Sequence, residues 1–139
     1  MGIKKFSIND KPIVCLTAYD YKTACIVDNY CDVVLVGDSV GMALYGEKTT
    51  TNVTLDTMIR HGQSVRKGVK KSYMVVDMPK NTYKNKIQAF KNAKKIITQT
   101  RCDAVKLEGG KKIINIINYL VRKRIKVVGH IGLLPQSIN

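Results

Sequence analysis

The chain has 139 residues, of which 45% are hydrophobic and 24% are charged. This length and composition predict one globular domain over residues 1–139 and exclude a wholly disordered chain. No apolar run approaches the ~18 residues of a membrane-spanning helix, and the N-terminal residues do not resemble a secretory signal. Four cysteines without a Cys-x-x-Cys pair indicate free thiols, as expected in the reducing cytoplasm.

The net charge of +14 brings a basic nucleic-acid-binding module into consideration. Nineteen of the 24 basic residues are lysines, however, and the seven tyrosines are not interleaved with them. This pattern argues against nucleic acid as the partner, because such sites combine arginines with exposed aromatic side chains. The ten acidic residues, only two of them glutamates (Glu47 and Glu108), are more informative because they are rare.

In the first half of the chain, short apolar runs alternate with helical patterns. The pattern predicts a strand at residues 12–17, a helix at 20–29, a strand at 33–36, a loop at 37–52, a helix at 54–66 and a strand at 72–77. Asp20 and Thr54 stand where helix N-caps are expected. The uninterrupted apolar run at 33–36 is typical of a strand covered on both faces.

The second half continues the alternation. It predicts a helix at residues 83–100, a strand at 104–107, a helix at 113–121 and a strand at 125–129. In the first of these helices, Ile87, Phe90, Ala93 and Ile97 lie along one side. Alternating strands and helices predict a parallel α/β sheet, either doubly wound or part of a (β/α)8 barrel. A G-x-G-x-x-G fingerprint is absent after the first strand, which disfavours a dinucleotide-binding sheet.

Polar residues recur where the predicted strands end. Asp38, Asp77 and Glu108 follow three consecutive strands, and His130 follows the next. Barrel enzymes keep their active sites at this rim, and a cluster of carboxylates suits Mg²⁺. Lys106 lies two residues from Glu108 and therefore on the same side of its strand, where a cation suits an anionic substrate. Each acid alone is also typical of a turn or helix cap, and His130 of a structural hydrogen bond.

Six segments, in order, carry a resemblance to a known family. They are LTAYD (16–20), LVGDSVGM (35–42), VT (53–54) with Met58 and His61, DMP (77–79), VKLEGG (105–110) and GHIGLLPQS (129–137). The set resembles ketopantoate hydroxymethyltransferase (3-methyl-2-oxobutanoate hydroxymethyltransferase) from about residue 12 onward.

The resemblance implies a Mg²⁺-dependent (β/α)8 TIM barrel. Its reaction transfers a hydroxymethyl group from 5,10-methylenetetrahydrofolate to 3-methyl-2-oxobutanoate, giving 2-dehydropantoate in pantothenate biosynthesis. Matched by motif, Asp38, Asp77 and Glu108 form the metal site, and Asp38, Ser39, Asp77 and Lys106 contact the ketoacid. His130 matches a histidine that lines the same pocket. The resemblance also implies a homo-oligomer for the full-length family.

A complete barrel takes ~250 residues, so we expect a barrel truncated after about five parallel strands and four helices. The resemblance places the family's general base, a glutamate, in the other half, so no catalytic base is assigned here. Three functions stay open at this point: a hydroxymethyltransferase, an inactive fragment or half-enzyme that needs a separate C-terminal half, and the nucleic-acid-binding module. A partly built barrel also exposes apolar strand faces, which predicts self-association or marginal folding of the isolated chain.

Overall fold

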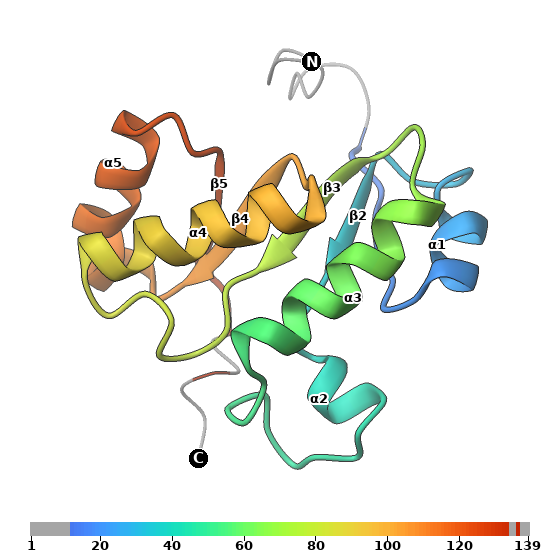
Figure 1. The fold of residues 1–139 in the computed structure, drawn as a ribbon, viewed down its shortest axis with the longest axis horizontal. Helices are drawn as coiled ribbons and strands as arrows, with labels where there is room; N and C mark the ends of the chain where they lie inside the picture. The colour runs from blue at the N-terminus through green and yellow to red at the C-terminus, as the bar shows by residue number, and fades with distance from the viewer. Residues whose placement is uncertain (1–11, 134–135, 137–139) are drawn as a thin grey trace.

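The computed structural model describes residues 12–133 and residue 136, and its strands and helices alternate along the chain (Figure 1). The strands are β1 (Cys15–Thr17), β2 (Val33–Val36), β3 (Tyr73–Asp77), β4 (Ala104–Glu108) and β5 (Val127–His130). The helices are α1 (Tyr21–Val27), α2 (Val40–Ala43), α3 (Leu55–Gly68), α4 (Lys86–Thr100) and α5 (Ile114–Arg122), with a 3-10 turn, η2 (Gly110–Ile113), before α5. Within the described residues, no helix combines the length and apolarity that crossing a membrane requires.

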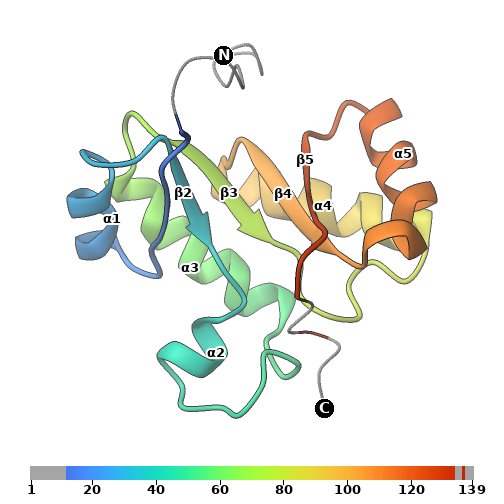
Figure 2. The same cartoon turned by 180° about the vertical axis from the view of Figure 1, so that it is seen from behind.

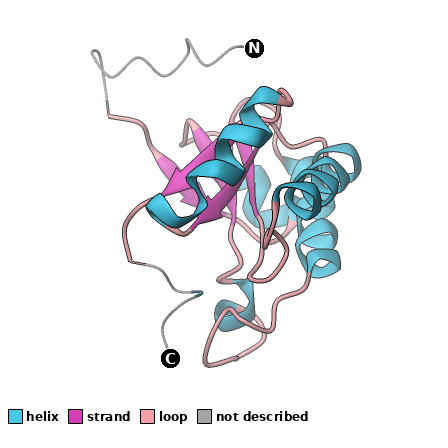
Figure 3. Cartoon of the chain, turned by 90° about the vertical axis from the view of Figure 1, so that its left-hand side faces the viewer, coloured by secondary structure: helices cyan, strands magenta, loops and turns pink. Residues whose placement is uncertain are grey.

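The five strands form one parallel sheet in the order in which they occur in the chain. A doubly wound sheet reverses its strand order at a switch point, whereas an unreversed order is typical of a barrel wall. The helices also pack in chain order, α1 on α3, α3 on α4 and α4 on α5. Figure 2 shows α3 and α4 behind the strands, and Figure 3 shows the strands as one layer beside the helices. The predicted α/β barrel topology is confirmed.

Three of the helices begin at a side-chain cap. Asp20, Thr54 and Asn85 have extended backbones, and the side chain of each accepts a hydrogen bond from the backbone N–H three residues later. Such caps satisfy N–H groups that have no partner inside the helix. The first two caps confirm the predicted starts of α1 and α3. The third sets the start of α4 at Lys86, three residues after the predicted start.

The buried side chain of Asp28 ties the end of α1 to the segment that enters β3. Its carboxylate accepts hydrogen bonds from the backbone N–H groups of Lys70 (2.8 Å), Lys71 (3.1 Å) and Ser72 (2.9 Å). Burial opposes ionisation, but these backbone hydrogen bonds prevail and hold the pKa of Asp28 below its usual value. The clamp fixes where β3 starts, and with it the position of Asp77 at the other end of that strand.

The predicted apolar side of α4 is confirmed in part, because Ala93 is buried and Phe90 and Ile97 pack, partly buried, against the core. The buried residues of α4 are Ala89, Ala93, Ile96 and Thr100, whereas Ile87 is 69% exposed. Gly62 of α3 marks a close approach of the two helices, because a Cβ atom there would lie 2.7 Å from Cγ2 of Thr100. The two helices approach so closely that small side chains, not the largest apolar ones, define the contact.

Two short helical segments depart from the predicted pattern. Residues 37–52 are predicted as a loop, but Val40–Ala43 form the single turn α2, in which the N–H groups of Met42 and Ala43 donate to the carbonyl of Ser39. One turn is too short to show a helical period. In the last helix only Leu120 is fully buried, and Ile114 and Val121 of the predicted apolar side are exposed.

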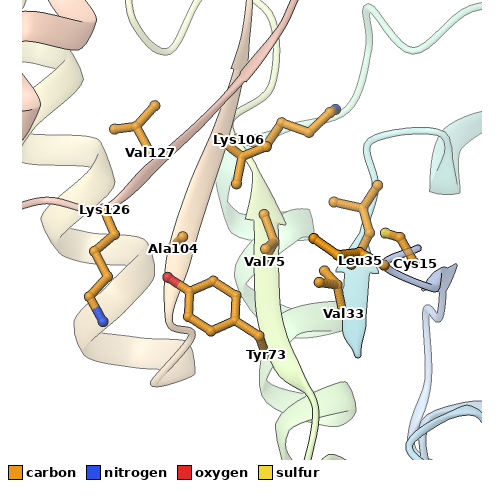
Figure 4. A pocket seen from close by; sticks show the side chains of 11 residues that line it. Cys15, Val33, Leu35, Tyr73, Val75, Ala104, Lys106, Lys126 and Val127 are labelled. Carbon is orange, nitrogen blue, oxygen red and sulfur yellow. The ribbon is translucent and has the colours of Figure 1, made fainter. Parts of the chain in front are cut away.

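The sheet has two unlike faces. In β2, Val34 and Val36 are fully buried towards the helices, whereas Val33 and Leu35 line a cavity of about 460 Å³ on the other face (Figure 4). We call this other face the inner face; its lining also includes Cys15, Tyr73, Val75, Ala104, Lys106, Lys126 and Val127. The prediction that β2 is covered on both faces is therefore wrong for the inner face, which the described residues leave open.

Candidate active site

Three buried carboxylates lie at the carboxyl ends of adjacent strands. Asp77 is the last residue of β3, Glu108 is the last of β4, and Asp38 stands two residues after β2. They are only 6% (Asp38), 3% (Asp77) and 7% (Glu108) exposed. The parallel registers of β2, β3 and β4 bring them to one rim of the sheet, as the sequence predicts. We call these three residues the acid cluster.

Asp77 is held by a salt bridge and by the backbone of its neighbour. Its Oδ1 lies 2.7 Å from Nζ of Lys106, which faces it in the adjacent strand, and its Oδ2 accepts a hydrogen bond from the N–H of Asp38 at 3.2 Å. Burial raises the pKa of Asp77 to about 6, although the Lys106 ammonium opposes that shift. Asp77 and Lys106 thus form a partly desolvated ion pair at the centre of the rim.

Gln136 joins the other two carboxylates of the acid cluster. Its side-chain amide donates to Oδ2 of Asp38 at 2.6 Å and to the carbonyl of Met78 at 3.1 Å, while its backbone N–H donates to Oε1 of Glu108 at 2.7 Å. Burial raises the pKa of both Asp38 and Glu108, and these hydrogen bonds from Gln136 oppose the shift. One residue therefore connects the ends of three strands.

Tyr83 completes this network from the loop before α4. Its hydroxyl lies 2.5 Å from Oε1 of Gln136 and 3.1 Å from the carbonyl of Glu108. Burial raises the pKa of the Tyr83 phenol, so the group stays protonated and serves as a donor. It fixes the amide of Gln136 with its nitrogen towards Asp38.

Ser39 belongs to a second polar chain beside the acid cluster. Its Oγ lies 2.7 Å from the hydroxyl of Tyr19. Nδ1 of His61 donates to the carbonyl of Tyr19 at 2.5 Å, which leaves Nε2 to accept from the hydroxyl of Tyr45 at 2.6 Å. The Ser39 side chain makes no capping hydrogen bond to α2; its hydroxyl is held at the rim by Tyr19 instead.

His130 is the last residue of β5 and pairs in register with Glu108. The positive charge that its imidazole can carry opposes the rise in the pKa of Glu108. Its Nε2 contacts the carbonyl of Leu133. The structure thus brings all the predicted site residues, Asp38, Ser39, Asp77, Lys106, Glu108 and His130, to the same edge of the sheet.

The donor chemistry of the acid cluster fits an oxygen-preferring divalent cation. Carboxylates are the ligands that Mg²⁺ prefers. Burial disfavours the charged form of these carboxylates, and a bound cation offsets that cost. The buried Thr50 hydroxyl lies close enough to Asp38 to lower the pKa of that carboxyl. Among the described residues, it has no partner within hydrogen-bond geometry. Among the described residues, no three acidic, histidine or cysteine side chains stand at ligand spacing; Lys106 pairs with Asp77, and Gln136 donates to Asp38 and Glu108.

The sequence pattern identified the acids but not the residues that connect them. Tyr83 lies in a loop without a repeating pattern, and Tyr19, although it stands inside the matched segment 16–20, has a role only through its tertiary contacts. Gln136 stands inside one of the six matched segments, but its position there does not reveal its hydrogen bonds. The sequence offers one signal that Tyr83 lies near the rim: it follows the rim residue Asp77 by only a few positions.

Comparison with known proteins places these residues in a family. The family profile described as Ketopantoate hydroxymethyltransferase matches residues 2–139. The chain belongs to this family. It is 60% identical over 129 residues to the 3-methyl-2-oxobutanoate hydroxymethyltransferase of Pelagibacter ubique and 54% identical over 130 residues to that of Rhizobium etli. These matches cover 93% of the chain but 50% and 48% of the two relatives. This member of the ketopantoate hydroxymethyltransferase family thus spans about half the length of the curated relatives it matches.

Solved structures confirm the fold of this family member. Oxaloacetate acetylhydrolase matches with a TM-score of 0.63 at 14% identity, covering 86% of this chain and 47% of that one. 2,3-Dimethylmalate lyase, a member of the PEP mutase/isocitrate lyase superfamily, matches with a TM-score of 0.61 at 15% identity, covering 84% and 46%. At these identities the likeness concerns the fold alone. The described strands correspond to about half of each such barrel chain.

Proposed function

We propose that the acid cluster is the ketoacid- and metal-binding part of a 3-methyl-2-oxobutanoate hydroxymethyltransferase. The reaction transfers a hydroxymethyl group from 5,10-methylenetetrahydrofolate to 3-methyl-2-oxobutanoate and yields 2-dehydropantoate, towards pantothenate. The observation that carries the proposal is the convergence of three buried carboxylates with Lys106 at one rim, in a chain that belongs to this family. A cytoplasmic homo-oligomer is the assembly that we propose for the complete enzyme.

Asp38, Asp77 and Glu108 would hold Mg²⁺. When bound, this ion supplies Lewis-acid polarisation of a substrate carbonyl. The chain's own residues then have separate roles. Only 18% of the Lys106 side chain is exposed. Its ammonium group therefore offers a partly desolvated positive charge to the substrate carboxylate. The Ser39 hydroxyl offers a second donor, and Tyr19 orients it.

The remaining residues of the rim shape the pocket rather than react. Gln136, held by the Tyr83 hydroxyl, donates hydrogen bonds to both Asp38 and Glu108, which limits like-charge repulsion between the two carboxylates. His130 stands on the next strand, beside Glu108, and would line the ketoacid site. We assign no general base to the described residues; by resemblance, that glutamate belongs to the other half of the barrel.

The decisive experiment measures the binding of 3-methyl-2-oxobutanoate by calorimetry, with Mg²⁺ and again with EDTA. We expect Mg²⁺-dependent binding, and we expect Asp77→Asn to weaken it at least about tenfold because a ligand and an ion-pair partner are lost together. Asp56→Asn is the matched control, since it removes the same charge from an exposed acid whose salt bridge, among the described residues, is with Lys95 on α4. Equal losses in the two variants, or binding that EDTA leaves unchanged, would overturn the proposal.

A further inference from the structure

The amino ends of the strands, opposite the acid cluster, carry a dense group of cations. The ends of α3, α4 and α5 and the segments that lead from them into β3, β4 and β5 lie together there, because these strands are parallel neighbours (Figure 2). Four of the five arginines of the chain stand in these segments. We call the nine cationic residues of this surface the basic patch: Arg66, Lys67, Lys70, Lys71, Arg101, Arg122, Lys123, Arg124 and Lys126.

The fold also brings aromatic side chains to the basic patch, although they are not interleaved with the cations along the chain. Tyr30, which is 73% exposed, lies in the segment that enters β2, at the same end of the sheet. Nζ of Lys71 donates to Oδ1 of Asn29, the neighbour of this tyrosine, at 3.1 Å. Nζ of Lys126 lies 5.7 Å from the ring centre of Tyr73. Arginines beside an exposed aromatic ring are thus combined in space rather than in sequence.

The acids at this end of the sheet leave much of the positive charge unbalanced. Asp28, Asp32 and Asp103 each accept at least one hydrogen bond from a backbone N–H group. Arg66 forms a salt bridge with Asp103 at 3.9 Å. Three exposed arginines have no salt bridge among the described residues: Arg101, Arg122 and Arg124. A surface with an excess of one charge concentrates ions of the opposite sign.

Two arginines of the basic patch occupy a backbone conformation that favours glycine. Arg101, directly after α4, has a φ of 55°, and Arg124, two residues after α5, has a φ of 62°. The left-handed region costs stability for most side chains and is tolerated best by glycine and asparagine. Asn81, the other left-handed non-glycine residue of the described chain, is of the tolerated type. A cation inside the last helical turn would offset the helix dipole without that cost, so the dipole does not account for these two arginines.

We propose that the basic patch binds single-stranded nucleic acid through its phosphate backbone, without sequence specificity. Guanidinium groups bind phosphate through a planar fork and stack on bases, and an exposed tyrosine ring offers a second stacking surface. An acidic peptide would use the charges alone, so the exposed ring of Tyr30 favours an unpaired strand. The proposal is independent of the proposed function, because β3 runs about 13 Å from Tyr73 at the basic patch to Asp77 in the acid cluster.

The test measures the fluorescence anisotropy of a labelled oligouridine and a labelled oligothymidine with the 139-residue chain. Each probe is about 20 nucleotides long, which exceeds the site of one small binding domain. With four phosphates contacted, the affinity should fall about fiftyfold between roughly 50 and 200 mM salt. A glutamate homopeptide and vesicles of phosphatidylserine and phosphatidylcholine are titrated in parallel.

Two double variants locate the binding surface. Glycine fits the left-handed conformation, so Arg101→Gly with Arg124→Gly should keep or raise the urea midpoint of unfolding. The same variant should bind oligouridine about tenfold more weakly, with a salt slope shallower by about 1.4, because two phosphate contacts are lost. Lys91→Gln with Lys94→Gln is the matched control, since it removes the same charge from exposed lysines of α4. Should the glycine pair not fold, Arg101→Asn with Arg124→Asn takes its place, because asparagine also tolerates this conformation.

The outcomes decide between the partners. The proposal is overturned if neither oligonucleotide binds at low salt, or if the arginine pair and the lysine pair lose affinity equally. Binding of the glutamate peptide as tight as that of oligouridine overturns it in favour of an acidic protein, and binding to the vesicles alone overturns it in favour of a lipid surface. Tighter binding of one oligonucleotide supports the proposal and identifies the sugar. Mg²⁺-dependent binding of 3-methyl-2-oxobutanoate should be unchanged in the arginine pair, so each proposal can fail without the other.

Discussion

Replacing Asp28 by asparagine tests how the entry to β3 is stabilised. The carboxylate accepts hydrogen bonds from three backbone N–H groups, those of Lys70, Lys71 and Ser72. In Asp28→Asn a single oxygen remains to accept them, and the new NH₂ group faces donors. A hydrogen bond to a charged group contributes roughly 1.5–3 kcal/mol, and a buried donor left without a partner costs about as much. We expect the free energy of unfolding at pH 7 to fall by about 3 kcal/mol.

The same variant has a defined pH dependence. Although burial opposes it, the backbone hydrogen bonds hold the pKa of Asp28 below its usual value in the folded chain. A carboxyl whose pKa is lowered by folding stabilises the fold above its unfolded-state pKa of about 3.9, and this stabilisation disappears as the pH falls through the folded-state value. The difference between parent and Asp28→Asn should therefore be full at pH 7 and shrink below about pH 4.

Urea unfolding followed by circular dichroism at pH 7, 5 and 3 provides the measurement. Asp32→Asn is the matched control, because the exposed Asp32 side chain accepts one backbone hydrogen bond, from Val14 at 3.1 Å. That control should lose about 1 kcal/mol or less. A similar loss in both variants, or a difference for Asp28→Asn that does not change between pH 7 and pH 3, would refute the reasoning.

Two further predictions concern the rim and the inner face. Gln136→Leu should lower the free energy of unfolding by about 2 kcal/mol in urea titrations, because Asp38 and Tyr83 lose a buried partner. As the control, Gln99→Leu at the surface of α4 should change the free energy of unfolding by no more than about 0.5 kcal/mol. Equal losses in the two variants would contradict the role of Gln136. Because the inner face is open, the isolated chain should bind the dye ANS and self-associate in sedimentation experiments. Val128 is 40% exposed at this face, and Val128→Lys should reduce both ANS binding and self-association. A monodisperse parent chain that does not bind ANS would contradict this prediction.

The acids at the rim could be predicted from the sequence because their position follows from topology alone. Once strands and helices alternate, parallel strands must deliver Asp77 and Glu108 to one edge, whatever the packing between them. Their connection through Gln136 could not be predicted in this way, since it depends on side-chain geometry across the sheet. In α4 the predicted apolar side was right for Ala93, which is buried, but wrong for Ile87, which is 69% exposed. Apolar periodicity alone does not show where a helix meets its neighbour, such as the close approach of Gly62 to Thr100.

The boundaries of the elements show the same division. The strand predicted at residues 12–17 shortens to β1, since the pairing of β1 with β2 begins at Cys15 and Val33. The strand predicted at residues 104–107 instead includes Glu108, because β4 keeps its register with β5 up to His130. Composition and period locate an element, whereas hydrogen bonding to a neighbouring strand decides where it ends.

Gln136 also has a consequence for the order in which the molecule assembles during synthesis. Its bond to Asp38 joins residues 98 positions apart, and its bond to Tyr83 joins residues 53 apart. Closing so long a loop is entropically costly and slow compared with forming neighbouring strand–helix units. On the ribosome, the sheet from β1 to β4 can therefore form while the acid cluster still lacks its amide. The rim becomes a single polar network only after residue 136 has left the exit tunnel, which makes the site the last part of the described fold to mature.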